Sequence, residues 1–553
     1  MTLFPPCVGE LKEKYFLPTD LVPQAVLKDT EKSEEATIMV SGQLKGKSLS
    51  LVIGLIGAVG FVLQGYDQAV SNGLLTLGSF IAVFPQIDTV HTTGSQKSHN
   101  STIQGTTVAI YEVGCALGAG SCAFLGDRLG RRKTIFLAGC IALIGVVIQS
   151  TPFALGQLIA GRVITGLGVG GFTATIPMYV SESSLAKARG RMVLLEGWFA
   201  IGGIVLATWL EFGLYYVGDN SVSWRFPIAF QGLFALIVVG CIMLLPESPR
   251  WLARAGRLEE AAAVLARIED VSVDSEHVLQ EMDIIRQSLV MDQNVESSGS
   301  SSPFALTKNR HLHRTILAVG VNILAQMTGV NIITFYSDTI FEGDLGYSGT
   351  LSRIITGCLQ IWQFIAAGLA VLLIDRVGRR PLFIAAAVGM TVAQACLAGL
   401  SSDLGNKSAA GASLLFYFMA LFCFPIGLFL VPFMYAAEIA PLRTRAQVTA
   451  MSAAANWLFN FVLAEVSPVG FATISWRYYI IYACISAFAC IFFYFLCPET
   501  KGRTLEEIDD IFVQSKSVLD TVRVARQMPY QAEILAHIDE TEKGIDEKQV
   551  EHA

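Results

Sequence analysis

Two charged residues lie inside long apolar stretches of this chain of 553 residues. Asp67 lies toward the end of the first stretch, within Gln64-Gly65-Tyr66-Asp67-Gln68, and Arg162 lies in the fourth. An ionised side chain in hydrocarbon is costly, and it usually faces protein or a water-filled path along which ions or protons move. Asp67 and Arg162 are therefore candidates for such movement, provided that the stretches around them span a membrane.

The composition indicates that the apolar stretches span a membrane. Hydrophobic residues make up 53% of the chain and charged residues only 15%, whereas a typical soluble domain has about 25% charged residues. Twelve spans of about 20 residues would place roughly 240 residues in hydrocarbon and leave the charges to loops and tails. This balance excludes a soluble enzyme and a disordered scaffold, and the net charge of −7 offers no basic face to a nucleic acid.

The apolar runs fall into two sets of six. The first set covers residues 50–71, 105–125, 134–151, 154–178, 192–212 and 226–245, and the second covers 315–336, 352–374, 381–400, 413–436, 448–468 and 477–497. The expected fold is an all-α membrane protein with twelve transmembrane helices in two pseudo-symmetric six-helix bundles. The predicted division is an N-terminal segment 1–48, a first bundle 49–245, a linker with helices 246–314, a second bundle 315–497 and a tail 498–553.

Lysine and arginine concentrate in the segments that follow even-numbered spans, for example Arg131, Arg132 and Lys133 after the second. Positive residues favour the cytosolic side, so these segments and both termini are predicted to be cytosolic. Residues 1–48 lack the apolar core of a signal peptide. On the outer side, two Asn-x-Ser/Thr sequences predict N-glycosylation at Asn100 and Asn406.

Three short motifs occur once in each half. Asp127-Arg-Leu-Gly-Arg-Arg132 returns 248 residues later as Asp375-Arg-Val-Gly-Arg-Arg380. The stretch that ends at Glu182 resembles the one that ends at Glu438, and Pro246-Glu-Ser-Pro-Arg250 resembles Pro498-Glu-Thr-Lys-Gly-Arg503. Repeated halves around a site at the membrane midplane are the architecture of a secondary transporter.

These motifs resemble those of the sugar-porter family of the major facilitator superfamily, and most of all its fungal members. Two further motifs add to the resemblance, Gly161-Arg162-xxx-Gly166-x-Gly168-x-Gly170-Gly171 in the fourth span and Gln326-xx-Gly329-Val330-Asn331 in the seventh. The quoted motifs extend from Gly65 to Thr500, over nearly all twelve spans. The resemblance implies alternating access by rocking of the two halves, and a sugar-like solute.

The resemblance also gives the two charged residues a role. In proton-coupled members, an acid at the position of Asp67 pairs with an arginine at the position of Arg162, and protonation releases the arginine and favours one state. The alternative is a structural ion pair at a helix end, as in facilitators that do not couple to protons.

The repeated cytosolic motifs imply a gate. By resemblance, their acids and arginines form salt bridges between helices that close the cytosolic side in the outward-open state, and the alternative is a set of plain positive-inside anchors. The residues concerned are Asp127, Arg128, Arg132, Glu182, Arg189, Glu247, Arg250, Asp375, Arg376, Arg380, Glu438, Arg445 and Glu499.

Amides in the seventh span match sugar contacts of the family. Gln326 and Asn331 would be about 140° apart on an ideal helix, so they converge only if the helix breaks, and Gly329 permits a break. Core packing is the alternative for the whole set. The other expected substrate contacts are Gln64, Tyr336, Gln363, Phe433 and Asn456.

Four departures from the family pattern put a simple hexose in doubt. Ala325 replaces a glutamine, Gly197 an amide in the fifth span, Phe433 a tryptophan, and Gln64 an aromatic residue. A polyol, a modified or larger sugar, or a sugar-derived metabolite is expected instead of glucose. Two further intramembrane acids, Glu112 and Glu196, match no family role.

The leading interpretation is a proton-coupled importer of a sugar-like solute that works as a monomer in the plasma membrane. An exporter of a sugar-derived secondary metabolite and a non-transporting sugar sensor remain alternatives. No set of nucleophile, base and orienting group points to an enzyme, and no cofactor other than the coupling proton is expected. The eleven cysteines show neither CxxC spacing nor a Cys/His cluster, which argues against a metal site or a disulfide framework.

Overall fold

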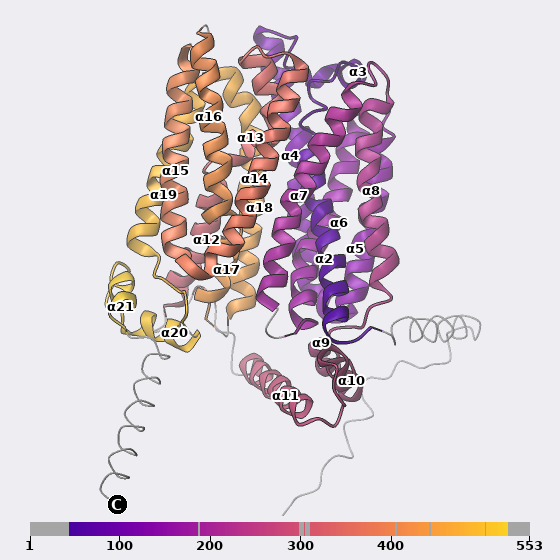
Figure 1. Ribbon diagram of the computed structural model, residues 1–553, viewed down its shortest axis with the longest axis vertical. Coiled ribbons are helices and arrows are strands. Elements are labelled where there is room, and N and C mark those ends of the chain that lie inside the picture. Colours follow the sequence, from indigo (N-terminus) through magenta and orange to yellow (C-terminus); the bar gives the residue numbers. More distant parts are fainter. Residues whose placement is uncertain are drawn as a thin grey trace, which may run out of the picture.

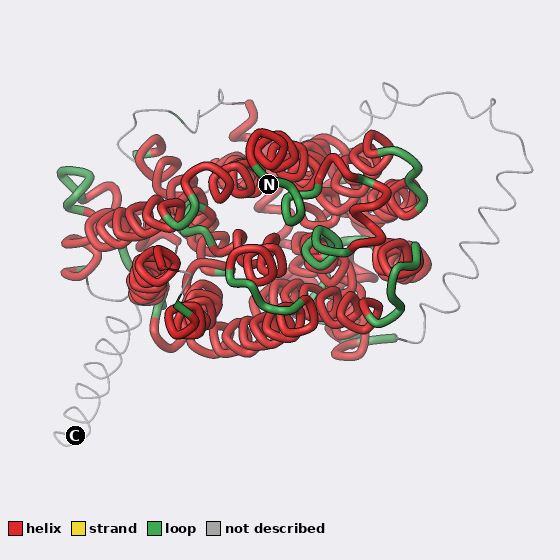
Figure 2. The backbone as a smooth tube through the Cα atoms, turned by 90° about the horizontal axis from the view of Figure 1, so that it is seen from above, coloured by secondary structure: helices red, strands yellow, loops and turns green. Residues whose placement is uncertain are grey.

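The computed structural model describes residues 44–185, 189–297, 304, 310–403, 406–441, 444–503 and 505–528. These residues form helices joined by short loops, and the part of the chain that the structure describes contains no strand. Figures 1 and 2 show the long helices running side by side along one direction.

The first bundle contains six long helices. They are α2 (Gly46–Ala69), α4 (Gly94–Leu129), α5 (Arg131–Ser150), α6 (Leu155–Glu182), α7 (Arg189–Tyr215) and α8 (Val222–Ile242). The short helices α3 (Gly78–Val83) and η2 (Pro85–Ile87) connect α2 to α4. We call the end of the bundle near α3 the outer end (Figure 1).

The second bundle follows the same plan with two interrupted helices. Its elements are α12 (His311–Gln326), α13 (Val330–Thr339), the π-helical turn η3 (Ile340–Asp344), α14 (Gly349–Val377), α15 (Arg379–Leu400), η4 (Ser401–Asp403), α16 (Lys407–Phe424), the π-helical turn η5 (Pro425–Phe429), α17 (Val431–Ile439), α18 (Arg445–Ile474) and α19 (Arg477–Leu496). Gly329, with φ +84°, separates α12 from α13, which confirms the break expected in the seventh span.

Eleven of the described helical segments are long and apolar enough to cross a membrane. The remaining long helix of the two bundles, α4, has 36 residues and runs alongside the others, packed against α6 and α18. Together they give the twelve spans expected from the sequence. Helix α4 is longer than the predicted run 105–125 because polar residues at both of its ends continue the same helix.

Glycines on α6 let neighbouring helices approach it closely. A Cβ at Gly166 would clash with the carbonyl oxygen of Tyr111, and one at Gly170 with that of Cys115. Small residues allow such backbone contact between membrane helices. The glycine face of α6 thereby fixes the height and rotation of α4, which carries Tyr111 and Glu112.

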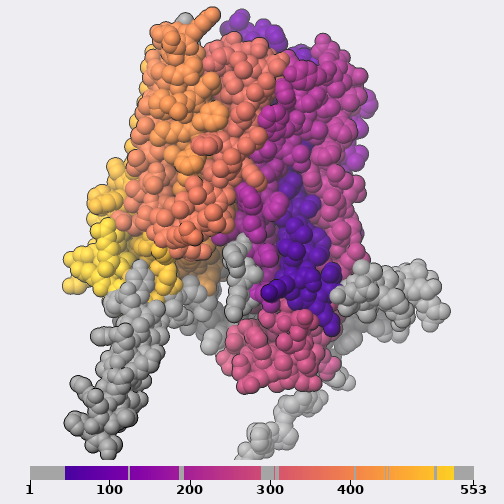
Figure 3. All heavy atoms as spheres, in the orientation of Figure 1, coloured from indigo at the N-terminus to yellow at the C-terminus, as the bar shows by residue number. Residues whose placement is uncertain are grey.

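Small helices cover the inner end of the bundle (Figures 1 and 3). Helices α9 (Pro249–Arg254), α10 (Leu258–Glu269) and α11 (Glu276–Ser297) share an apolar cluster of their own beneath the first half. Helices α20 (Leu505–Gln514) and α21 (Thr521–Gln527) lie beneath the second half, where Asp509 forms an ion pair with Arg314.

The two predicted glycosylation sites differ in the folded protein. Asn100 is 0% exposed, and its Nδ2 donates to the carbonyl oxygens of Asp88 at 2.7 Å and Pro85 at 3.3 Å. A glycan is attached through that nitrogen, so the folded structure contradicts the expectation for Asn100. Asn406 is exposed and caps α16 through its Oδ1, which leaves its Nδ2 outside this contact.

Replacing Gly170 by alanine is expected to lower the stability of the bundle by about 1–3 kcal/mol, because overpacking forces α4 and α6 apart. Gly156→Ala is the matched control on the same helix, since a Cβ there would meet nothing within 4 Å. Thermal unfolding of the detergent-solubilised protein measures the difference. Equal melting temperatures for the two variants would contradict the close contact.

Candidate functional site

The expected ion pair is present in the first half. Arg162 Nη1 on α6 lies 3.8 Å from Asp67 Oδ1 on α2, and the side chains are 5% and 0% exposed. This separation exceeds a hydrogen bond, so the pair is electrostatic. Arg162 also donates to the carbonyl oxygen of Val108 at 3.1 Å and lies 5.4 Å from the ring centre of Tyr111. The guanidinium is therefore held by α4 as well as by the carboxylate.

A small cavity borders this pair on the side toward the outer end. Its polar lining comes from Ser71, Thr107, Gln149 and Arg162, and apolar residues of the segment after α2 and of α3, α4, α6 and α8 complete it. Arg162 therefore borders a small, mainly apolar cavity with a few polar groups in its wall.

The amides of the seventh span form a connected chain in the second half. The break at Gly329 turns Asn331 back toward Gln326, and Asn331 Nδ2 donates to Gln326 Oε1 at 2.7 Å. Gln326 Nε2 in turn donates to Asn456 Oδ1 on α18 at 3.0 Å. Three of the predicted substrate contacts are therefore side by side, and each is 5–8% exposed.

This chain continues across the boundary between the halves. Asn331 Nδ2 also donates to Asn460 Oδ1 at 2.7 Å, and Asn460 Nδ2 donates to Glu112 Oε1 on α4 at 2.8 Å. Asn460 is not among the substrate contacts predicted from the sequence. Its spacing of four residues from Asn456 places both amides on one face of a helix, and that signal could have identified it.

The other predicted contacts occupy different surroundings. Tyr336 is 2% exposed, and its hydroxyl donates to the carbonyl oxygen of Ala464 at 2.7 Å, so it fastens α13 to α18. Gln363 is buried and Gln64 is half-buried. Phe433 is 40% exposed on α17. No hydrogen bond of the described residues links these four to the amide chain.

Glycine at position 197, where the family has an amide, does not leave an open space in the protein. A Cβ at Gly197 would overlap Cδ2 of Leu430, so the leucine fills the space that a longer side chain would take. Ala325 is 0% exposed. The small residues at these two positions thus leave no added space, whereas the polar groups of the family pattern are still missing there.

Polar contacts join the two halves at the outer end. Asn72 after α2 donates to Ser337 Oγ on α13 at 2.9 Å and accepts from the backbone N–H of Asp338 at 3.2 Å. Arg353 on α14 donates to the carbonyl oxygen of Gly73 at 3.2 Å and to Thr76 Oγ1 at 2.7 Å. These contacts close the outer side of the bundle.

Arg353 is the centre of this outer contact. It is 2% exposed, it lies 4.1 Å from the ring centre of Tyr215 on α7, and its Nη1 is 3.4 Å from Glu342 Oε2. A buried guanidinium needs such partners to offset its lost hydration. The outer end is therefore joined by an arginine that reaches from one half into the other.

At the inner end, each half contains its own charge cluster. In the first half, Arg131 Nε lies 3.2 Å from Glu182 Oε2, and Glu247 accepts from the backbone N–H groups of Arg131 and Arg132. Burial raises the pKa of the Glu247 carboxyl, against the lowering effect of these N–H groups and that of Ser248. The cluster ties α5 to α6 and to the segment after α8.

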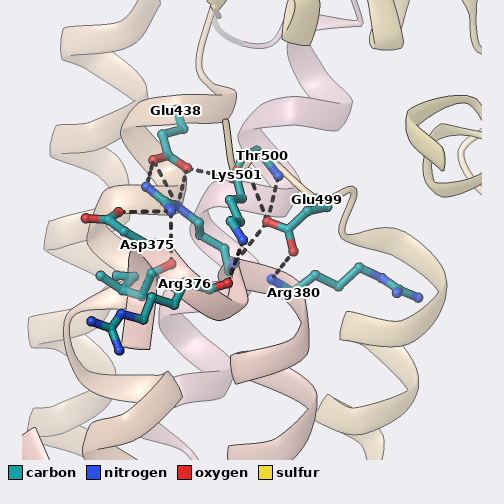
Figure 4. Close-up of polar contacts among 9 residues, drawn as sticks. Asp375, Arg376, Arg380, Glu438, Glu499, Thr500 and Lys501 are labelled. Carbon is teal, nitrogen blue, oxygen red and sulfur yellow. Dashed lines mark hydrogen bonds and ion pairs between the residues drawn. The ribbon is translucent and has the colours of Figure 1, made fainter. Parts of the chain in front are cut away.

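The second half repeats this cluster (Figure 4). Arg379 Nη2 lies 2.8 Å from Glu438 Oε1, and Glu499 accepts from the backbone N–H groups of Arg379 and Arg380 at 2.9 and 3.1 Å. Thr500 Oγ1 donates to Glu438 Oε2 at 2.6 Å. The two clusters are pseudo-symmetric, as the repeated motifs predict.

The residues that form the two clusters differ in part from those predicted from the sequence. The arginines whose side chains pair with the acids are Arg131 and Arg379, which follow directly after Gly130 and Gly378 at the helix starts. Arg128, Arg250 and Arg376 are exposed, because they lie on the outward turn of their segments. The guanidinium groups of Arg132 and Arg380 donate to the carbonyl oxygens of Met243 and Tyr494.

Four other residues were predicted to belong to the cytosolic gate. Asp375 lies 3.4 Å from Arg379, and Arg445 begins α18. The side chains of Asp127 and Arg189 lie outside the described residues. In this structure, whose halves are joined at the outer end, both clusters hold helices of one half together. Their closing of the cytosolic side in the outward-open state stays a prediction.

Comparison with known proteins places this arrangement in context. The family model "Sugar (and other) transporter" matches residues 53–512. The MFS-type transporter oryC of Aspergillus oryzae is 35% identical over 486 residues, which cover 86% of this chain and 88% of that protein. The sugar transporter STL1 of Saccharomyces cerevisiae is 35% identical over 495 residues, covering 88% and 85%.

Solved structures of a xylose transporter have the same fold. The proton:xylose symporter XylE bound to 6-bromo-6-deoxy-D-glucose is 25% identical, with a TM-score of 0.69 over 84% of this chain and 100% of that chain. A partially occluded inward open conformation of XylE from E. coli, 24% identical over 83% and 100%, gives a TM-score of 0.68.

Arg379→Ala is expected to lower the free energy of unfolding by about 2–4 kcal/mol, since removing one partner of a largely buried pair strands the other charge. Arg376→Ala, at the exposed neighbouring arginine, is the control and is expected to have little effect. Thermal unfolding in detergent compares the two. A shift of the same size in both variants would argue against a specific role of the cluster.

Arg353→Ala is expected to favour states that are open on the outer side, because the charge-assisted contacts to the first half are lost. The rate at which a membrane-impermeant maleimide labels Ser337→Cys, in a chain free of other cysteines, should rise about tenfold. Arg225→Ala is the control, since Arg225 at the outer end of α8 bonds within its own half, to Ser150 and Pro152. Unchanged labelling in Arg353→Ala would exclude Arg353 as an outer closing contact.

Proposed function

The chain belongs to the sugar transporter family of the major facilitator superfamily, and on this premise we propose that it moves a sugar-like solute together with a proton. Transport proceeds by alternating access of the two halves. The observation that carries the coupling is the buried pair of Asp67 and Arg162 at 3.8 Å. Because this distance exceeds a hydrogen bond, a proton can neutralise Asp67 without breaking a network that holds the fold.

The pair is well placed to act on the relative position of helices. Asp67 belongs to α2, whose next turn leads to Asn72 at the outer contact, and Arg162 is held by α4 through Val108. Loss of the charge on Asp67 leaves Arg162 attached to α4 alone. Protonation therefore changes which helices the guanidinium joins, and a change of this kind can shift an equilibrium between two states.

The amide chain is the proposed solute site. Gln326, Asn331 and Asn456 offer both donors and acceptors, which suit the hydroxyl groups of a sugar or polyol. In the described conformation these amides satisfy one another, so a solute must replace their mutual hydrogen bonds. A site of this kind favours a solute with several hydroxyls in a matching arrangement over one that lacks them.

The solute is proposed to be a polyol, a modified or larger sugar, or a sugar-derived metabolite rather than glucose. Gly197 and Ala325 lack the amides that the family pattern has at these positions, and Leu430 presents an apolar surface beside Gly197. A hexose hydroxyl placed there would find no partner, which costs about 1–3 kcal/mol. We further propose that the protein imports this solute as a monomer in the plasma membrane, with both termini cytosolic.

Asp67→Asn is expected to abolish accumulation of solute against a gradient and to leave exchange partly intact, because the variant cannot change its charge. The purified protein in liposomes is supplied with labelled D-glucose, D-xylose, glycerol, sorbitol and myo-inositol under an inward proton gradient, with and without an uncoupler. Counterflow exchange in the same liposomes measures solute movement without the gradient.

Two outcomes would contradict the proposal. Accumulation by Asp67→Asn, or uptake by the unmodified protein that is insensitive to pH and to the uncoupler, would exclude proton coupling through this residue. High-affinity uptake of D-glucose in preference to the other four solutes would exclude the proposed solute class while leaving the coupling in place.

A further inference from the structure

Glu112 carries a buried carboxylate near the middle of α4. It belongs to neither of the two charge clusters at the inner end. It is 1% exposed and lies on α4, one residue after Tyr111. Its Oε1 accepts from Asn460 Nδ2 at 2.8 Å, and its Oε2 has no hydrogen-bond partner among the described residues. A buried carboxylate with a free oxygen is costly, so it calls for a functional explanation.

One guanidinium serves two acids here. Arg162 on α6 lies 3.8 Å from Asp67. It also donates at 3.1 Å to the carbonyl oxygen of Val108, which lies one helical turn before Glu112 on the same face of α4. The guanidinium is therefore near both carboxylates and acts electrostatically on each of them. The groups that face Glu112 from packed helices are therefore Arg162, Asp67 on α2 and Asn460 on α18, with Tyr111 and Cys115 on its own helix. With one cation and two acids, the net charge of the group depends on how many protons it holds.

Glu112 is also the point where this group meets the solute site. The hydrogen-bonded chain runs from Asn456 through Gln326 and Asn331 to Asn460, and Asn460 uses its amide nitrogen for Glu112. A solute that binds Asn331 competes with the bond from Asn331 to Asn460. Loss of that bond frees Asn460 Oδ1, so the amide can turn and withdraw its Nδ2 from Glu112. Glu112 without this donor interacts more strongly with Arg162.

We propose that Glu112 is the positioning residue that couples the solute site to the Asp67–Arg162 pair, by competing with Asp67 for Arg162 according to whether Asn460 holds it. This deepens the proposed function and rests on it. The bond between Asn460 and Glu112 crosses from α18 to α4, so it exists only while these two helices are in contact. Solute binding and rocking of the halves therefore act on the same carboxylate.

The test uses the full-length protein in liposomes that contain the pH dye pyranine, with the five solutes named above as probes. Addition of a transported solute to the unmodified protein should draw protons inward. In Glu112→Gln, the external pH at which this signal is half-maximal should move by roughly one unit toward acid, because Arg162 then interacts with Asp67 alone. Glu112→Asp keeps the charge and is expected to stay at the unmodified position.

Glu465→Gln is the matched control. Glu465 also lies on the contact between α18 and α4, where it accepts from Thr106 Oγ1 at 2.7 Å, but it is outside the amide chain. A structural loss at this contact would affect both variants alike, whereas the proposal expects the pH shift only for Glu112→Gln. An equal shift in Glu465→Gln would overturn the proposal.

Failure of the proposed function and failure of the role of Glu112 give different results. If the unmodified protein moves solute without protons, the proposed function is wrong. If it moves protons with solute and Glu112→Gln keeps the same pH dependence, only the role of Glu112 is wrong. Should Glu112→Gln not reach the membrane, Asn460→Leu replaces it: this variant keeps the carboxylate but removes its partner, and an unchanged ratio of protons to solute would overturn the proposal.

Discussion

A guanidinium that keeps its charge inside the membrane is the constraint on which the first half depends. Arginine does not lose its proton in proteins, so Arg162 must be stabilised at all times by groups that are themselves costly to bury. The structure provides Asp67 at 3.8 Å, the carbonyl of Val108 and the ring of Tyr111. The last two belong to α4, and the glycine face of α6 brings α4 near enough to supply them.

The charge clusters of the inner end meet a different need. Each joins helices within one half, through Arg131 with Glu182 and through Arg379 with Glu438. Transport by rocking requires halves that move as rigid bodies, and a buried ion pair that fixes two helix ends supplies such rigidity. In this structure the repeated motifs thus hold the helices of each half together, while contacts between the halves lie at Asn72, Arg353 and Asn460.

How far the sequence could predict this site differs from residue to residue. The break at Gly329 followed from the need of Gln326 and Asn331 to converge, and the twelve spans followed from hydropathy alone. The sequence did not show which of the three arginines in each repeated motif pairs with the acids. That choice depends on the turn at Gly130 or Gly378, whose positive φ directs the next residue inward. The bond from Asn460 to Glu112 and the burial of Asn100 depend on contacts between segments far apart in the chain, which local patterns do not record.

The chemistry of the contacts between halves suits a protein that must leave each state again. The outer contacts are hydrogen bonds to Asn72, Gly73 and Thr76, and water can replace such bonds at a net cost of about 1 kcal/mol each. An apolar seam of the same extent would hold one state too firmly, since its opening exposes hydrocarbon. The amide chain at the centre follows the same logic, because the mutual bonds of Gln326, Asn331 and Asn456 are of a kind that water or a hydroxyl group can replace. Opening of the outer side is thus an exchange of hydrogen-bond partners of similar strength, which keeps the free-energy difference between the two states small enough for a modest bias to shift it.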